Sequence, residues 1–174
     1  MATALFINRT DLVKNTIING NVDSDLFLQS VKLAQQTHVL QYCGSALYDE
    51  ISNKILASQA AVNPVPIDAD TQTLLNDFLQ PMLIHFSMVD YLPFCSFQIK
   101  NGGLFKTTSE TGANVNKDEV DYLVQKHRSS AEFYTRRFID YMSFNAAAKF
   151  PKYYENRNEQ MQPEKSAAFT GWVL

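Results

Sequence analysis

The sequence contains few of the residues that staple small secreted proteins together. Its 174 residues include only two cysteines, Cys43 and Cys95, and these form no CxxC pair. In a reducing compartment, an isolated cysteine in an apolar segment packs as a small hydrophobic side chain. The first residues, MATALFINRTDLVKN, lack the basic patch, apolar stretch and cleavage site of a secretory signal. We therefore expect a protein that is made in the cytoplasm and folds without disulfides.

Long apolar runs and a basic charge balance are missing as well. The most apolar stretch, 81–97, is interrupted by His85, Asp90 and Pro93, and it falls short of the roughly 18 residues that span a bilayer. The formal net charge is −3. Without a basic field, a chain cannot neutralise phosphates by releasing counterions. The sequence thus argues against a membrane protein and against ordinary nucleic-acid binding.

Aromatic residues are plentiful, whereas charged residues are scarce. Aromatic side chains make up 12% of the chain, and charged residues make up only 19%, below the usual quarter or so. A surface that is poor in charge and rich in Tyr and Phe favours a protein partner that covers it. The length suits one domain with an appendage.

Helical periodicity dominates the middle of the chain. Apolar residues recur at helical spacing over 22–42, 45–58, 70–92 and 118–150, which predicts four helices. Gly44 separates the first two helices, because only glycine adopts the left-handed conformation cheaply. The last helix carries the longest apolar stripe: Val120, Leu123, Val124, His127, Ala131, Tyr134, Phe138, Tyr141 and Met142.

Two features interrupt this helical pattern. Pro81 lies inside the apolar stripe of the third helix, where we expect a kink. Between the third and fourth helices, 97–107 alternates around an Asn-Gly turn, which is a strong signal for a β-hairpin. A polar stretch to Asn116 completes this hairpin and loop region, 97–116.

We therefore predict an all-α protein: a four-helix bundle with a small β-hairpin and an extended C-terminal arm. The bundle covers 22–150, preceded by an arm with one short helix (1–21) and followed by the C-terminal arm (151–174). A polar stretch separates the apolar residues of this last arm from the bundle, and we expect them to dock on a partner. Folding back onto the bundle is the alternative. These residues are Tyr153, Tyr154, Phe169, Trp172, Val173 and Leu174.

The sequence lacks the common catalytic and metal-binding motifs. None of the seven Glu residues has a His three positions later, as di-iron bundles require, and no GxxxxGK[ST], GxGxxG, GxSxG or HExxH occurs. His38, His85 and His127 lie one per predicted helix, on or beside apolar stripes. A packing role fits them better than metal binding, with a three-histidine site as the alternative. We predict no catalytic residue, no metal and no cofactor.

The dibasic pair Arg136-Arg137 lies on the fourth predicted helix. Two guanidinium groups at this point could bind phosphate or the carboxylates of a partner, such as a neighbouring subunit. The alternative is a solvated helix face with local ion pairs from Arg136 to Glu132 and to Asp140.

The segment 31–51, with a helix, a Tyr42-Cys43-Gly44 stop and a Leu47-Tyr48 continuation, resembles the head-tail connector (adaptor) proteins of tailed bacteriophages. Related segments more often carry Leu at the position of Cys43. Further pieces are similar to a subgroup from phages of Bacteroidetes hosts, including crAss-like phages: 15–22, 81–85, 91–94, 134–142 and 171–174.

This resemblance implies a structural virion protein rather than an enzyme. Connector proteins of this kind form a homo-oligomeric ring, commonly of twelve copies, which docks beneath the portal protein and extends the DNA channel toward a downstream tail or neck ring protein. DNA passes through non-specifically, no membrane is involved, and the protein is made in the host cytoplasm and found in the virion neck. We expect the apolar C-terminal residues named above to contact the portal or a neighbouring ring subunit. Residues of the hairpin would face a neighbour or the channel: Asn101, Gly102, Phe105 and Lys106.

Two other function classes fit the same residues. A small helical enzyme or ligand-binding bundle would use His85, Tyr91 or the three histidines in a pocket, and would show a strongly perturbed His or Tyr in a cleft. A cytoplasmic helical regulator would dimerise through the fourth helix. A connector requires exposed patches on two opposite sides of the subunit.

Overall fold

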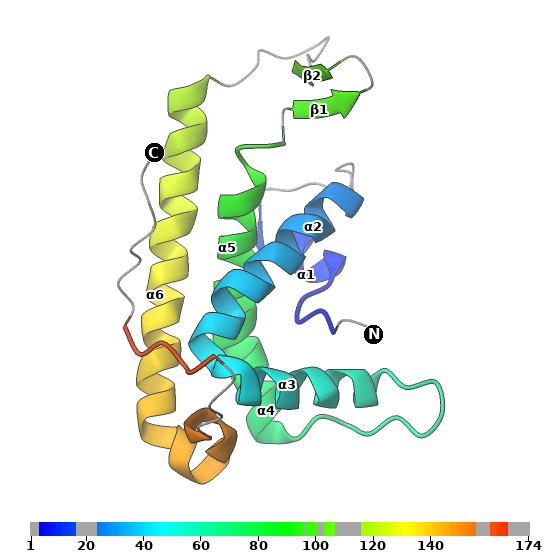
Figure 1. The fold of residues 1–174 in the computed structure, drawn as a ribbon, viewed down its shortest axis with the longest axis vertical. Coiled ribbons are helices and arrows are strands. Elements are labelled where there is room, and N and C mark those ends of the chain that lie inside the picture. Colours follow the sequence, from blue (N-terminus) through cyan, green and yellow to red (C-terminus); the bar gives the residue numbers. More distant parts are fainter. Residues whose placement is uncertain are drawn as a thin grey trace.

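The computed structural model describes residues 4–16, 24–95, 97–100, 103–106, 116–155 and 161–166, and it confirms the all-α class. Helices account for almost all of the described regular structure (Figure 1). Among the described residues, no helix has the length and hydropathy to cross a lipid bilayer. The helical elements are α1 (Arg9–Asn15), α2 (Ser24–Ala34), the π-helix η1 (Gln35–Val39), α3 (Leu40–Ser58), α4 (Ala69–Leu74), the π-helix η2 (Leu75–Leu79), α5 (Gln80–Tyr91), α6 (Lys117–Lys149) and the 3₁₀-helix η3 (Pro151–Tyr154).

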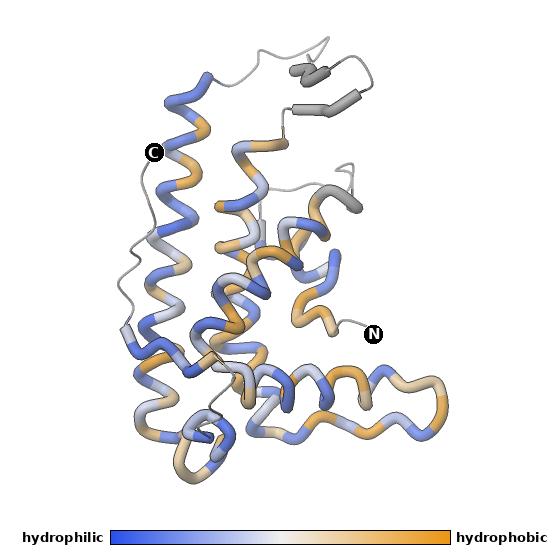
Figure 2. The backbone as a smooth tube through the Cα atoms, in the orientation of Figure 1, coloured by the Kyte–Doolittle hydropathy of each residue, from blue (hydrophilic) through white to orange (hydrophobic). Residues whose placement is uncertain are grey.

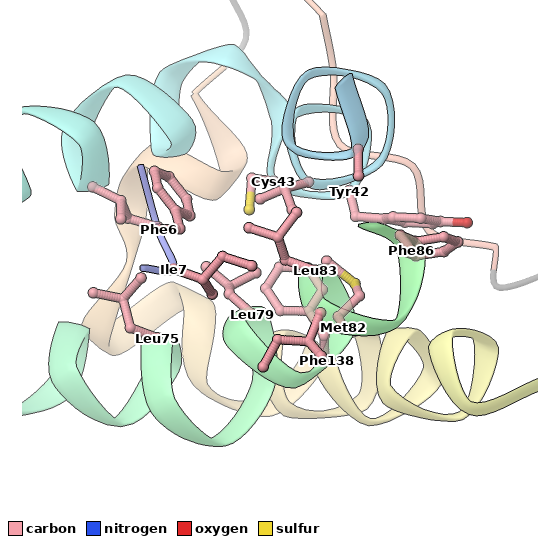
Figure 3. Close-up of a cluster of buried hydrophobic side chains, with 14 of the residues drawn as sticks. Phe6, Ile7, Tyr42, Cys43, Leu75, Leu79, Met82, Leu83, Phe86 and Phe138 are labelled. Atoms are coloured by element: carbon pink, nitrogen blue, oxygen red, sulfur yellow. The ribbon is translucent and has the colours of Figure 1, made fainter. Parts of the chain in front are cut away.

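Helix α5 is the centre of the fold. It contacts α2 on one side and α6 on the other, and none of its residues is exposed (Figure 1). A helix that is apolar all round must be buried in this way. The surrounding core, part of which Figure 3 shows, includes Leu79, Met82, Leu83, Phe86 and Phe138.

Helix α6 is the longest element and begins at a capping box. The side chain of Asn116 accepts a hydrogen bond from the backbone N–H of Glu119, whose carboxylate accepts one from the N–H of Asn116. Part of the predicted stripe is fully buried, and most of its remainder is half-buried against the core. The buried face of the helix comprises Ala131, Thr135, Phe138, Met142 and Ala146.

The predicted break at Gly44 is confirmed. The chain is helical from α2 through η1 into α3, and it turns at Gly44, where φ is +72° and ψ is 159°. This conformation has positive φ but is extended rather than left-handed helical, and it is accessible essentially only to glycine. The remainder of α3 therefore runs in a new direction, away from the line of α2 and η1.

The chain stays helical through Pro81. A π-helical turn, η2, precedes the proline, and the N–H of Gln80 donates to the carbonyl of Leu75. Pro81 occupies the first turn of α5, where its missing N–H is least costly.

The N-terminal segment packs into the same core as the bundle. Ala4, Phe6, Ile7 and Leu12 are all buried. The buried amide of Gln35 holds this segment, because it accepts from the N–H of Phe6 at 3.0 Å and donates to the carbonyl of Ala4 at 2.8 Å. The predicted arm 1–21 thus contributes core residues, which its weak sequence pattern did not indicate.

Helix α3, the loop 59–68 and the start of α4 form a projection that we call the α3–α4 arm, residues 45–70. It extends away from α5, on the side opposite α6 (Figure 1). Lys54 braces it through ion pairs with Glu50 at 2.8 Å and Asp68 at 2.9 Å. Asp68 also caps α4 by accepting from the N–H of Thr71.

A two-stranded antiparallel pair follows α5. Strand β1 (Phe97–Lys100) pairs with β2 (Gly103–Lys106), with Phe97 opposite Lys106 and Lys100 opposite Gly103. The side chains of these residues are not among those that the structure describes.

Truncating Phe138 to alanine should destabilise the protein strongly. Phe138 is fully buried, so the cavity and the lost apolar contacts should cost roughly 3–5 kcal/mol of the free energy of unfolding. The matched control is Phe144→Ala on the same helix, because Phe144 is 86% exposed and its loss should cost under about 0.5 kcal/mol. Chemical denaturation measures both, and similar losses would show that the buried face of α6 is misassigned.

Candidate interaction surfaces

Helix α6 carries a row of exposed aromatic side chains that the sequence analysis missed. Tyr122, Phe133 and Phe144 are 61%, 57% and 86% exposed, and successive members lie 11 residues apart. Eleven residues make slightly more than three helical turns, so the three aromatic side chains share one face of the helix. That face lies opposite the buried face that packs on α5, and hence points away from the molecule. We call this row the aromatic ridge; its 11-residue spacing is visible in the sequence.

Basic side chains accompany the aromatic ridge. Lys126 lies over the Tyr122 ring at 5.4 Å, and Arg137 lies 5.9 Å from the Phe133 ring centroid. Arg136 is exposed. Within the described part of the chain, neither of the expected local ion pairs of Arg136, to Glu132 or to Asp140, is formed. Its guanidinium group is thus available to an external carboxylate.

The α3–α4 arm presents a second apolar surface. Val62 and Val65 in its loop are 78% and 60% exposed, and Figure 2 shows hydrophobic residues along this loop. The N–H of Val65 donates to the carbonyl of Ala57 at 3.1 Å, which connects the loop to the end of α3. Along α3 runs an open groove of about 510 Å³, lined by Ala46, Asp49, Glu50, Asn53, Lys54, Ala57 and Lys152.

The C-terminal segment 161–166 folds back onto the chain's own α3. The N–H of Ser45 donates to the carbonyl of Met161 and the N–H of Glu164 donates to the carbonyl of Gln41, both at 3.0 Å. Pro163 sits against Gly44 so closely that a Cβ there would lie 2.7 Å from its Cδ. This part of the tail therefore follows the cis alternative that the sequence left open.

The predicted portal-facing residues do not share one environment. Tyr153 is only 3% exposed and packs edge-on against Phe138, so it is not available to a partner, contrary to expectation. Pro151 starts η3, which turns the chain and carries Tyr153 into the core. Tyr154 is 48% exposed. Four further predicted contacts lie outside the described residues: Phe169, Trp172, Val173 and Leu174.

The predicted hairpin contacts lie at the limit of what the structure describes. Asn101 and Gly102 fall outside the described residues. Phe105 and Lys106 belong to β2, which fixes their backbone but not their side chains.

Two of the three histidines meet between α5 and α6. The Nδ1 atoms of His85 and His127 lie 3.0 Å apart, and Tyr134 stacks on the His85 ring. His38 stacks instead on Phe86, with ring centroids 3.8 Å apart. At 3.0 Å, the Nδ1–H of one imidazole donates to the Nδ1 of the other, which therefore carries its own proton on Nε2. In the described part of the chain, no group of three His, Cys, Asp or Glu side chains could hold a metal ion.

Burial shifts the pKa values of the three histidines and of Asp90. It lowers the pKa of His85 to about 4, assisted by His127, and it lowers the pKa of His127 as well. Burial, with a smaller effect of Arg128, lowers the pKa of His38 to about 4. Burial raises the pKa of Asp90 to about 6. The histidines are therefore neutral at neutral pH.

Comparison with known families identifies the family of this chain. A family model described as "Family of unknown function (DUF6712)" matches residues 39–161. No curated protein and no solved structure matches the chain.

Replacing Gly44 with alanine should strain the turn between α2 and α3. The positive φ alone should cost roughly 1–3 kcal/mol of the free energy of unfolding. The contact with Pro163 should add to this cost, so Gly44→Ala should be less damaging in a Pro163→Gly background. A double-mutant cycle by chemical denaturation measures the difference. Equal costs in both backgrounds would show that Pro163 does not press on Gly44.

Acid should weaken the fold through the buried histidines. Their pKa values are lower in the folded state than the 6.5 of a free imidazole, so the unfolded chain binds protons first as the pH falls. The free energy of unfolding should therefore decrease from pH 6.5 toward pH 4, and His85→Gln should reduce this decrease. Asp90 has a raised pKa and acts in the opposite direction, so Asp90→Asn should steepen the decrease. Denaturation curves at several pH values test both signs, and an unchanged slope in the His85 variant would contradict them.

Proposed function

The chain belongs to this family of unknown function (DUF6712), whose description names no activity, so we propose a function from the exposed surfaces of the structure and from the sequence resemblance. We propose that the protein is a structural virion protein, a subunit of a head-tail connector ring. The ring docks on the portal vertex, extends the DNA channel toward the tail and contacts a downstream neck or tail protein. The fold is then a four-helix bundle of the connector type with a hairpin and a C-terminal arm.

The observation that carries this proposal is the aromatic ridge. Three large aromatic side chains stand in a row on the outer face of α6, about 16 Å apart along about 33 Å of helix, from the helical rise over 22 residues. Scattered exposed hydrophobic residues are ordinary, whereas an aligned aromatic row flanked by basic residues is typical of a protein interface.

A second apolar surface on the same subunit supports a ring. The loop of the α3–α4 arm, with exposed Val62 and Val65, lies at the opposite edge of the molecule from α6 (Figure 1). Two different interaction surfaces on opposite sides allow head-to-tail association, which closes into a ring when the rotation permits. A dimeric regulator would need only one self-complementary surface.

The proposal also covers the DNA channel, the C-terminal residues and the hairpin. A net charge of −3 suits a channel through which DNA slides without binding. Tyr154 and the apolar residues 169–174 are proposed to contact the portal or a neighbouring ring subunit, and Tyr153 is left out because it is buried. Asn101, Gly102, Phe105 and Lys106 are proposed to face a neighbour or the channel.

The oligomeric state of the full chain tests this proposal. We expect closed rings of uniform copy number, twelve by the resemblance, in electron micrographs and native mass spectra of the concentrated protein. We also expect mass spectrometry to detect the chain in purified particles of the encoding phage. A protein that stays monomeric and is missing from particles would exclude a connector and favour a ligand-binding bundle. A two-fold dimer would favour the regulator.

A further inference from the structure

We propose that neighbouring subunits associate through the aromatic ridge of one copy and the α3–α4 arm of the next. This inference rests on the proposed ring and specifies its contact: the occupant of the ridge is a second copy of the same chain. On the receiving side, the contact comprises the α3 groove and the exposed loop residues Val62 and Val65.

The two surfaces lie where such a contact requires them. The buried face of α6 packs on α5, so the ridge points outward from one edge of the molecule, while the arm projects from the other edge (Figure 1). One copy can therefore offer its ridge to a second copy while its own arm reaches a third. Every subunit then uses both surfaces, as a head-to-tail ring demands.

Charge favours ridge-to-arm contact over ridge-to-ridge contact. Residues 122–144 carry a net charge of +2, with four basic residues against Glu132 and Asp140. The arm, residues 45–70, carries −3, with four acidic residues against Lys54, and Lys152, which also lines the α3 groove, reduces the charge of the receiving surface to −2. Opposite fields attract, whereas two ridges would place like charges together. The four basic residues of the ridge segment are Lys126, Arg128, Arg136 and Arg137, and the four acidic residues of the arm are Asp49, Glu50, Asp68 and Asp70.

On each side of the proposed contact, one charged residue is free to form an ion pair with the neighbouring copy. Arg136 is exposed beside the ridge, and Asp49 is exposed in the α3 groove. In the part of the chain that the structure describes, neither side chain takes part in an ion pair. The other acidic residues of the arm differ, since Glu50 and Asp68 are paired with Lys54, and Asp70 with Lys149.

The dimensions of the two surfaces also agree. The groove extends from Ala46 to Ala57 on α3, which is 11 residues and hence about 16 Å. Neighbouring aromatic side chains of the ridge are separated by the same 11 residues. The loop extends the contact beyond Ala57.

The ridge alone is a small interface. At roughly 200 Å² per aromatic side chain, the exposed fractions leave about 400 Å², half of the roughly 800 Å² that each partner contributes to a stable complex. A single contact should therefore be weak, and closing the ring should strengthen it. Binding between isolated pairs has to be measured at high protein concentration.

Mixing two interface variants tests the pairing. The ridge variant carries Phe133→Asp and Phe144→Asp, and the arm variant carries Val62→Asp and Val65→Asp. All four side chains are exposed, so we expect circular dichroism and melting temperature to match the wild type. Alone, each variant should be monomeric; mixed, they should form a one-to-one dimer and no ring, because one intact ridge meets one intact arm. Leu33→Asp on α2, at a 52% exposed position outside both surfaces, is the control and should leave rings intact.

The other outcomes overturn the inference. An arm variant that still dimerises alone would show ridge-to-ridge contact, and a ridge variant that still forms rings would show that the ridge is not an interface. A mixture that stays monomeric even at high protein concentration, although the wild type forms rings, would place the contact elsewhere. Failure of the wild type itself to form rings would count against the proposed function and not specifically against this pairing.

Charge reversal gives a second measurement on full-length protein. Arg136→Glu should weaken ring formation several-fold, and combining it with Asp49→Arg should restore much of the loss. If Arg136→Glu acted by impairing folding, a second surface substitution would not repair the loss. Restoration in the double variant therefore shows that the two residues contact each other. Additive weakening in the double variant would exclude this ion pair.

Discussion

The backbone at Gly44 determines how the helices are arranged. Up to this residue, α2, η1 and the start of α3 run as one helix beside α5, and the positive φ of Gly44 turns the chain out of that direction. Three hydrogen bonds between the 161–166 segment and residues 41–45 hold the turn, with Pro163 packed on the glycine. Without this turn, α3 would continue along the bundle and the α3–α4 arm would not exist.

Gln35 is a buried polar side chain whose hydrogen bonds are satisfied within the core. Gln35 is 1% exposed, yet its amide bonds the backbone of Phe6 and Ala4 and the hydroxyl of Tyr48. A buried amide without partners would cost a few kcal/mol, whereas a satisfied one fixes the position of what it binds. Gln35 thus decides where the N-terminal segment lies, and His85 and His127 play a comparable part between α5 and α6.

Periodicity in the sequence predicted the long elements well, and it failed where position depends on distant partners. The stripe on α6 and the break at Gly44 are local patterns, and both are present in the structure. The burial of Phe6 and Tyr153 depends on contacts with α3, α5 and α6, which no local pattern encodes. The aromatic ridge is different: its 11-residue spacing is visible in the sequence, but a row of three rings gives a far weaker periodic signal than the apolar stripe on the opposite face.

The spacing of the ridge also constrains orientation. Eleven residues exceed three helical turns by about 20°, so the row of rings winds slowly around α6, by about 40° from Tyr122 to Phe144. A neighbour that touches all three rings cannot lie parallel to the α6 axis and must cross it at an incline of fixed hand. In a closed assembly every copy would repeat that incline with the same hand.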